Sequence, residues 1–265
     1  MKANKLVTLS FALLAALTST ALAQNKRDPN SMLFPPDAGY AGKSLAEWGQ
    51  AYRFWAATIP GPVDNFPGIN DGSSFQMNQQ GPVFFLGDSF IWSDPIPEAT
   101  PDPGSDYAPE QRHVTVPAHT ALYIAFEGNY VAVRFQSFLD ALGLTAEQFA
   151  QENLNTFLSF QPINGSLEID GTTVPIDTSG DSPYLNVSYI SGFPMADGSA
   201  IRDFFFDSTT TVPDPVAYLF IADISALIKP LSVGEHTIKT RVFDSFYGYP
   251  FSDLQAVDWH ITVTP

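Results

Sequence analysis

The sequence predicts a mainly β fold, an antiparallel β-sandwich that is jelly-roll-like and carries a few peripheral helices. Three observations lead to this prediction. Short apolar runs bounded by Gly, Pro, Asn and Asp recur along the chain, as is typical of strands. Helical periodicity is confined to two regions, residues 44–60 and 133–158. Strands and helices do not alternate regularly, which favours stacked antiparallel sheets over a parallel α/β sheet.

The first 23 residues have the pattern of a secretory signal peptide. Lys2 and Lys5 precede a short apolar run, and the segment closes in an Ala-Leu-Ala triplet that ends at Ala23. The run is too short to span a membrane, and small residues before a cleavage site are typical of exported proteins. We expect cleavage near Ala23, a secreted or periplasmic location, an extended lead-in over 24–40 and a single β-sandwich domain over 41–265.

The composition restricts the classes of partner. The chain has 12 Lys and Arg against 28 Asp and Glu, a net charge of −16, and the leader removes two of the lysines. Such a surface repels phosphates and anionic lipids, so we expect neither nucleic acid nor a membrane surface as partner. Cysteine is absent, which excludes disulfides, thiolate metal ligands and a cysteine nucleophile.

The first helix is predicted to begin at a capping box. Ser44 and Glu47 have the spacing of such a box, and Pro60 ends the periodic pattern. Trp48, Tyr52 and Trp55 follow at helical steps and make one face aromatic. We assign this face to the core, with a platform for stacking sugar rings as the alternative, because an aromatic stripe at helical spacing usually packs inward.

The remaining elements follow in order. Apolar runs and alternating segments predict strands, and two helices are predicted as an insertion near 133–158, the second starting at a capping box of Thr145 and Gln148. Between the first two strands, the proline-rich and acidic segment from Ser93 to Glu110 is predicted as a long surface loop. The predicted strands cover residues 81–87, 114–117, 121–126, 166–169, 173–176, 185–190, 217–221, 236–243 and 257–263.

Four sequence pieces together resemble a family of uncharacterised secreted bacterial proteins. The pieces are Trp48 with Trp55 and Pro60, the segment 80–86, Val116-Pro117 with the segment 121–123, and Pro-Leu-Ser-Val-Gly-Glu-His-Thr-Ile at 230–238. Members of the family are similar in having a Trp-rich first helix, a Gly-Pro-Val-Trp-Phe-Leu strand and a Pro-Leu-Ser-Pro-Gly-Glu-His-Thr-Ile hairpin. The resemblance implies export and a β-rich fold, and it implies no activity.

The chain departs from that family at three positions. Phe75 and Val114 stand where the resemblance leads us to expect cysteines, so an apolar contact would replace a disulfide if the two side chains face each other. Thr120 stands where the family tends to carry a lysine. Any role that the family assigns to this lysine therefore does not transfer to this chain.

Candidate catalytic residues are limited to one pair of carboxylates. No Gly-x-Ser-x-Gly elbow, phosphate-binding glycine loop or His-Glu-x-x-His motif occurs in the sequence. Asp88 and Glu127 each follow a predicted buried strand, so both could flank one end of a sheet. Two carboxylates are the minimum for glycoside hydrolysis, but acids at strand ends are also ordinary loop residues.

The acidic loop offers a second candidate site. Asp102 and Asp106 flank a Pro-Gly-Ser turn, and a calcium ion would relieve the repulsion among the loop's carboxylates. The alternative is a solvated loop that contributes only charge. Trp92 and Tyr107 at the ends of the loop are the expected ligand contacts.

The four histidines do not have the spacing of a metal motif. His113 and His119 could share one face of a strand, yet zinc needs three or four ligands and no clustered Glu or Cys supplies them. For His236 and His260 we expect structural roles in a strand entry and in the last strand.

These patterns favour a secreted, non-enzymatic protein that binds a carbohydrate or another envelope component. Predicted export, the predicted sandwich, 22 Phe, 10 Tyr and 4 Trp, and the missing catalytic motifs lead to this hypothesis. A glycan-active enzyme that uses Asp88 and Glu127 is the first alternative. A structural envelope protein is the second. No cofactor is expected beyond the calcium ion considered above.

Overall fold

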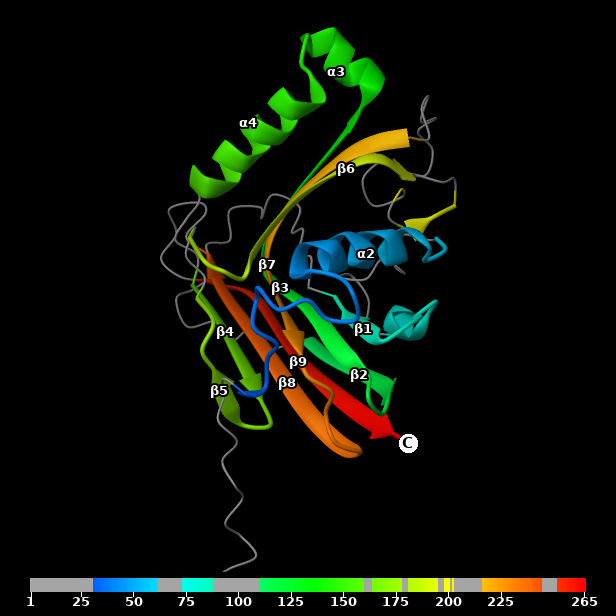
Figure 1. Cartoon of the computed structure of the whole chain (residues 1–265), viewed down its shortest axis with the longest axis vertical. Coiled ribbons are helices and arrows are strands. Elements are labelled where there is room, and N and C mark those ends of the chain that lie inside the picture. Colours follow the sequence, from blue (N-terminus) through cyan, green and yellow to red (C-terminus); the bar gives the residue numbers. More distant parts are fainter. Residues whose placement is uncertain are drawn as a thin grey trace, which may run out of the picture.

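Two β-sheets pack face to face and form a sandwich, as Figure 1 shows for the computed structural model. The first sheet has four strands in the order β1 (Val83–Leu86), β3 (Ala121–Phe135), β7 (Val216–Ile228) and β6 (Leu185–Pro194). The structure describes residues 31–61, 73–87, 110–159, 164–177, 181–194, 198–200, 202, 216–244 and 252–265. The two packed sheets confirm the mainly β sandwich that the sequence predicts.

The second sheet has five strands. Their order is β2 (Glu110–Pro117), β9 (Ser252–Thr264), β8 (Gly234–Asp244), β4 (Asn164–Ile169) and β5 (Thr172–Val174). Asp170 and Gly171 both have positive φ, 49° and 74°, and form the tight turn between β4 and β5 that the Asp-Gly pair predicts. Most strand pairs are antiparallel.

Two strand pairs are parallel, which the sequence did not reveal. β1 runs parallel to β3, with Val83 opposite Ala121, and β2 runs parallel to β9, with Glu110 opposite Val257. Strands β3 and β7 also extend well beyond the apolar runs that predicted them. The first continues through register shifts around Glu127, where extra residues bend the strand without ending its pairing.

Helix α2 (Leu45–Ala57) covers the outer side of the four-stranded sheet (Figure 1). The Ser44 hydroxyl accepts a hydrogen bond from the Glu47 N–H, and the Glu47 carboxylate accepts one from the Ser44 N–H, as the capping box predicts. Trp48, Tyr52 and Trp55 are only 5%, 1% and 5% exposed. The assignment of this aromatic face to the core is confirmed.

A short 3-10 helix, η3 (Ser73–Gln76), carries the aromatic core from α2 to the five-stranded sheet. The ring of Phe75 lies 5.9 Å from that of Trp55 and 4.8 Å from that of Trp259 in β9. Gly87 leaves room for this ring, because a Cβ atom at position 87 would lie 2.5 Å from Phe75. Phe75, at one of the two positions where the family resemblance leads us to expect cysteines, is thus fully buried among aromatic rings.

The side of the sandwich formed by β1 and β2 is closed by glutamine side chains. The Gln79 amide pairs with both backbone groups of Phe85 on β1, accepting from its N–H at 3.0 Å and donating to its carbonyl at 3.0 Å. Gln76 is placed to do the same for Thr115 on β2, at 2.9 and 3.1 Å. Each amide thus occupies hydrogen-bonding groups that an edge strand would otherwise leave open to another chain.

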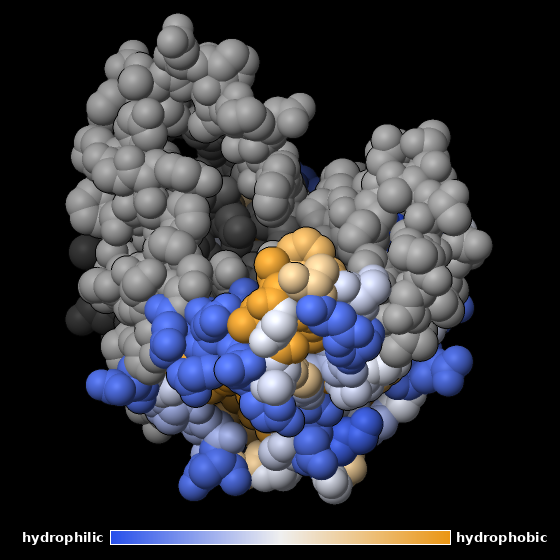
Figure 2. Space-filling model, turned by 90° about the horizontal axis from the view of Figure 1, so that it is seen from above, coloured by the Kyte–Doolittle hydropathy of each residue, from blue (hydrophilic) through white to orange (hydrophobic). Residues whose placement is uncertain are grey.

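Helices α3 (Gln136–Leu142) and α4 (Ala146–Ser159) form a hairpin at the end of the molecule opposite the C-terminus (Figure 1). Thr145 and Gln148 form the expected capping box of α4. Phe138 and Leu142 are 46% and 57% exposed. Seen from above, an apolar patch at this end is flanked by hydrophilic residues (Figure 2). None of the described helices is both long enough and apolar enough to cross a lipid bilayer.

Part of the expected lead-in is held against the core. Leu33 is 3% exposed and pairs with Ile228 at the end of β7, and the Phe34 N–H donates to the Leu227 carbonyl at 2.9 Å. The described end of the lead-in, residues 31–40, therefore contributes to the fold.

The aromatic face of α2 gives a first testable prediction. Trp48→Ala should lower the free energy of unfolding by about 3–5 kcal/mol, because it removes a large buried ring and leaves a cavity. Urea denaturation measures this loss. Phe54→Ala on the same helix is the matched control, since that side chain is 40% exposed. A Trp48 variant as stable as the Phe54 variant would contradict the core assignment.

A second prediction concerns the edge of β1. Gln79→Ala should cost about 1–3 kcal/mol of stability, because the Phe85 N–H loses its acceptor in a half-buried position. Thermal melts compare it with Gln151→Ala, whose exposed side chain donates to Asn155 on the same helix. Equal melting temperatures for the two variants would show that water replaces the Gln79 amide without loss.

Candidate functional site

The sequence-predicted site residues fall almost entirely outside the described part of the chain. Asp88, Trp92, Asp102, Asp106 and Tyr107 lie there, and so do the acidic loop and its expected calcium site. Glu127 is described only through its backbone, which lies opposite Ile224 with register shifts on both sides. The roles assigned to all six residues therefore stay predictions.

The outer side of the five-stranded sheet is a polar surface in the described part of the chain. Alternation along each strand buries residues such as Trp259 and Ile261 and turns their neighbours outward. We call this side the polar face. It carries Gln111, His113, Thr115, Ser166, Glu168, Thr173, Glu235, Thr237, Lys239, Arg241, Asp258, His260 and Thr262.

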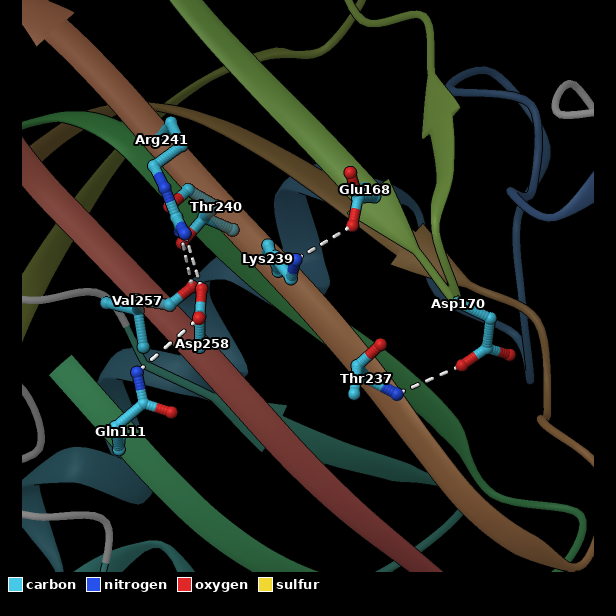
Figure 3. Close-up of polar contacts among 9 residues, drawn as sticks. All are labelled: Gln111, Glu168, Asp170, Thr237, Lys239, Thr240, Arg241, Val257 and Asp258. Carbon is cyan, nitrogen blue, oxygen red and sulfur yellow. Dashed lines mark hydrogen bonds and ion pairs between the residues drawn. The ribbon is translucent and has the colours of Figure 1, made fainter. Parts of the chain in front are cut away.

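A chain of hydrogen bonds crosses the polar face from β8 to β2 (Figure 3). Arg241 Nη2 donates to Asp258 Oδ1 at 2.6 Å, and Gln111 Nε2 lies 3.4 Å from Asp258 Oδ2. Gln111 Oε1 in turn lies 2.8 Å from His260 Nε2. The contacts at the two ends of this chain are short, whereas the 3.4 Å contact between Gln111 and Asp258 is long for a hydrogen bond.

Further along β8 the polar face holds one more ion pair. Lys239 lies 3.2 Å from Glu168 on β4, and both side chains are substantially exposed, at 41% and 35%. Exposed pairs of this kind contribute at most about 1 kcal/mol. The pair adds to the polar character of the face and contributes little to the stability of the fold.

His113 and His260 lie side by side on β2 and β9. They are opposite each other in the parallel register, and their imidazole rings stack with centroids 4.6 Å apart and planes at 12°. His113 and His119, which could have shared one face of a strand, do not, since His119 lies in the turn after β2 with a φ of 65°. No group of three or more potential metal-ligating side chains occurs among the described residues.

A second polar site lies buried beneath α2. Arg53 on α2 meets Tyr123 on β3, Asn186 on β6, and Asp223 and Ser225 on β7, and all five are at most 2% exposed. We call these residues the buried cluster. Arg53 Nη2 lies 3.4 Å from Asp223 Oδ2, and Asn186 Nδ2 lies 3.4 Å from the Tyr123 hydroxyl. Both distances are long for hydrogen bonds.

Burial dominates the electrostatics of this cluster. It raises the pKa of Asp223, against the opposing attraction of Arg53. Burial also raises the pKa of Tyr123 well above its ordinary value, and the nearby Asp223 carboxylate adds to this shift. Desolvation thus disfavours the charged form of both side chains.

The buried cluster is enclosed rather than open to a ligand. Gly49 brings α2 so close to the sheet that a Cβ atom there would lie 1.9 Å from Asn186 Nδ2. Asp223 Oδ1, Asn186 Oδ1 and Ser225 Oγ have no hydrogen-bond partner in the described part of the chain. Buried oxygens of this kind are commonly satisfied by internal water. The arrangement favours a structural role in fixing α2.

Ser232, His236 and Asp170 resemble a Ser-His-Asp triad, but their geometry opposes catalysis. His236 Nδ1 lies 2.7 Å from Asp170 Oδ2, and Nε2 lies 3.3 Å from the Ser232 hydroxyl. Nε2 also lies 2.8 Å from the Ser232 carbonyl oxygen, which only accepts. A nitrogen that donates to this carbonyl cannot also take the hydroxyl proton, which a catalytic base must do.

These three residues instead fasten two parts of the five-stranded sheet. Asp170 Oδ1 accepts from the Thr237 N–H at 3.0 Å, as Figure 3 shows. The turn between β4 and β5 is thereby tied to the start of β8. This agrees with the structural role expected for His236.

No pattern in the sequence directly predicts the hydrogen-bonded chain on the polar face. Gln111 and His260 are 149 residues apart, and their proximity depends on the parallel pairing of β2 with β9. Alternation within the last strand does place Asp258 and His260 on the face opposite Trp259. This alternation does not identify the strand that pairs with the last strand.

The fold makes the chain a two-sheet β-sandwich protein, and comparison with known proteins adds no family. No family model matches the chain, and no curated protein matches it. Among solved structures, the cysteine protease inhibitor EhICP2 from Entamoeba histolytica is 12% identical, over 58% of this chain and 86% of that one, with a TM-score of 0.21. A TM-score this low carries no argument about fold or function.

Asp223 gives a prediction about pH. Burial raises the pKa of Asp223 in the folded state. The part of the free energy of unfolding that depends on the protonated carboxyl is therefore present in full below the unfolded-state pKa of about 3.9. It is lost as the pH rises through the folded-state pKa. Asp223→Asn stays neutral and should lose less stability than the unmodified protein between acid and neutral pH. Urea denaturation from pH 4 to pH 7.5 measures the difference.

The control for this experiment is Asp37→Asn, which changes an exposed carboxylate. Its stability should follow that of the unmodified protein across the same range. If the Asp223 variant also followed it, Arg53 would be offsetting the cost of burying the charge, and the proposed balance in the buried cluster would be wrong.

Proposed function

We propose that this chain is an exported, non-enzymatic binding protein that takes a carbohydrate of the cell envelope on the polar face. The proposal combines the predicted signal peptide with the β-sandwich and its uncovered polar surface. Gln111 and His113 are exposed on this surface, and Asp258 and His260 are half-buried beside them. A ligand is thus offered several planar hydrogen-bonding groups at once.

The observation that carries the proposal is the hydrogen-bonded chain from Arg241 through Asp258 and Gln111 to His260. Sugar hydroxyls are both donors and acceptors, and they are recognised best by polar groups that are already held in place. Preorganised groups lose little conformational freedom on binding, so more of the hydrogen-bond energy appears as affinity. An isolated surface glutamine would not have this property.

The stacked rings of His113 and His260 supply the second element of sugar recognition. A pyranose has an apolar C–H side as well as its hydroxyl edge, and a flat ring offers surface for that side to pack on. The His113 ring is the more exposed of the two. The polar chain and the ring surface lie beside each other on β2 and β9.

Charge restricts the ligand further. The chain carries a net charge of −16, which opposes the approach of polyanionic glycans. A neutral saccharide is therefore the favoured ligand. Trp92 and Tyr107, which lie outside the described residues, stay predicted contacts of the acidic loop with a ligand.

The glycan-active enzyme stays as the second candidate because of one feature of the fold. β1 and β3 run in the same direction, and Leu86, two residues before Asp88, lies opposite Ile124, three residues before Glu127. β1 therefore ends beside the part of β3 that precedes Glu127, but β3 continues past Glu127 to Phe135. A site shared by the two carboxylates would lie along β3 and not at the end of the sheet that the sequence led us to expect.

A glycan array tests the proposed function. The unmodified protein should retain neutral glycans without cleaving them, and Gln111→Ala should weaken the tightest of these interactions by about tenfold or more, because it breaks the chain between Asp258 and His260. Thr173→Ala is the matched control. It removes an exposed side chain from β5, at the far edge of the same face.

Three results would contradict the proposal. Equal affinity of the Gln111 variant would remove the polar face as the site. Cleavage that is lost in Asp88→Asn and Glu127→Gln would favour the enzyme. Absence of both binding and cleavage would favour a structural envelope protein.

A further inference from the structure

The stacked histidines form a second kind of candidate site. We propose that His113 and His260 together bind one divalent first-row transition cation, of the zinc, nickel or copper class. The inference does not depend on carbohydrate binding. It starts from the register of β2 and β9, which places the two side chains opposite each other on an exposed sheet surface.

The spacing of the rings suits a shared metal ion. Imidazole nitrogen binds zinc at about 2.0–2.1 Å, so two ring centroids on one metal at angles of 90–110° lie roughly 4.5–5.2 Å apart. The centroids of His113 and His260 are 4.6 Å apart. The planes are nearly parallel, at 12°, so the His113 ring must turn about its side-chain torsions to point a nitrogen at an ion bound to His260.

The hydrogen-bonded chain prepares His260 for this role. Gln111 Nε2 faces the Asp258 carboxylate, so its amide oxygen must face His260, and His260 Nε2 must be the donor in that contact. A neutral ring with a proton on Nε2 has its lone pair on Nδ1, which is then the metal-binding atom. Metal-ligating histidines commonly donate their other N–H to an oxygen in this way, and that contact fixes the tautomer.

His113 is unconstrained by comparison. In the described part of the chain its ring makes no hydrogen bond, and it stacks on the ring of His260. It is free to turn either nitrogen toward an ion held by its neighbour. One ring is therefore fixed by its surroundings while the other adapts.

The ligand set defines the class of metal. Imidazole suits zinc, copper and nickel, whereas calcium and magnesium require oxygen ligands. Asp258 is already engaged by Arg241 at 2.6 Å, so it is better placed as support than as a third ligand. Two imidazoles leave the other coordination positions to water. We therefore expect an open site of moderate affinity rather than a closed structural one.

Calorimetric titration of the untagged protein with ZnCl₂, and separately with CuCl₂, tests the proposal. One equivalent should bind, and His113→Ala and His260→Ala should each weaken binding by about tenfold or more. Gln111→Ala should weaken it to a smaller extent, because Gln111 acts only through His260, within the roughly 10–100-fold range typical of such support. His119→Ala is the matched control, since His119 is exposed and unpaired with His260.

A spectroscopic readout separates metal ligation from a loss of folding. The copper complex should show an electron paramagnetic resonance spectrum with coupling to two imidazole nitrogens, and His113→Ala should reduce this to one while its melting temperature stays near that of the unmodified protein. The proposal would be overturned if no metal bound at millimolar concentration. It would also be overturned if His119→Ala weakened binding as much as His113→Ala.

Discussion

The packing of Phe75 between two other aromatic rings joins the parts of this molecule into one core. Its ring touches Trp55 of α2 on one side and Trp259 of the five-stranded sheet on the other, at 5.9 and 4.8 Å. The Arg112 guanidinium lies 5.3 Å from the same ring and donates to the Gly87 carbonyl at 3.3 Å. The contacts around Phe75 thus connect α2, η3 and both sheets in one continuous packed region. Close-packed interiors transmit strain, so a change at any of these rings affects all layers.

The buried cluster has a different effect on the same helix. Aromatic burial favours α2 against the sheet in many orientations, but polar groups impose one, because Arg53 must reach Asp223 and Gly49 must lie over Asn186. Buried ionic groups often cost stability relative to apolar residues of similar size. The imperfect hydrogen bonds of this cluster fit that view. Their contribution is the placement of α2, while the free energy comes from the rings around them.

Local signals in the sequence were sufficient for the elements but not for their pairing. The capping boxes at Ser44 and Thr145 depend on neighbouring residues, and both were predicted correctly. The parallel pairing of β2 with β9 depends on the whole chain. No pattern within either segment encodes it, so the contact of His113 with His260 could not be foreseen. The predicted sites at Asp88 and in the acidic loop depended on sequence neighbours alone, and the described structure does not reach them.

The polar face and the aromatic core are two sides of the same strands. In β9, burial of Trp259 between the sheets requires Asp258 and His260 to point outward, and in β2 the inward Arg112 fixes Gln111 and His113 outward in the same way. A one-residue slip of either strand would exchange the two sets and bury the polar groups without partners. The core therefore enforces the register that aligns Gln111 with Asp258 and His113 with His260. Functional side chains on strands fixed this firmly are placed more exactly than side chains on loops, which is the property that both a preorganised sugar site and a metal-binding pair require.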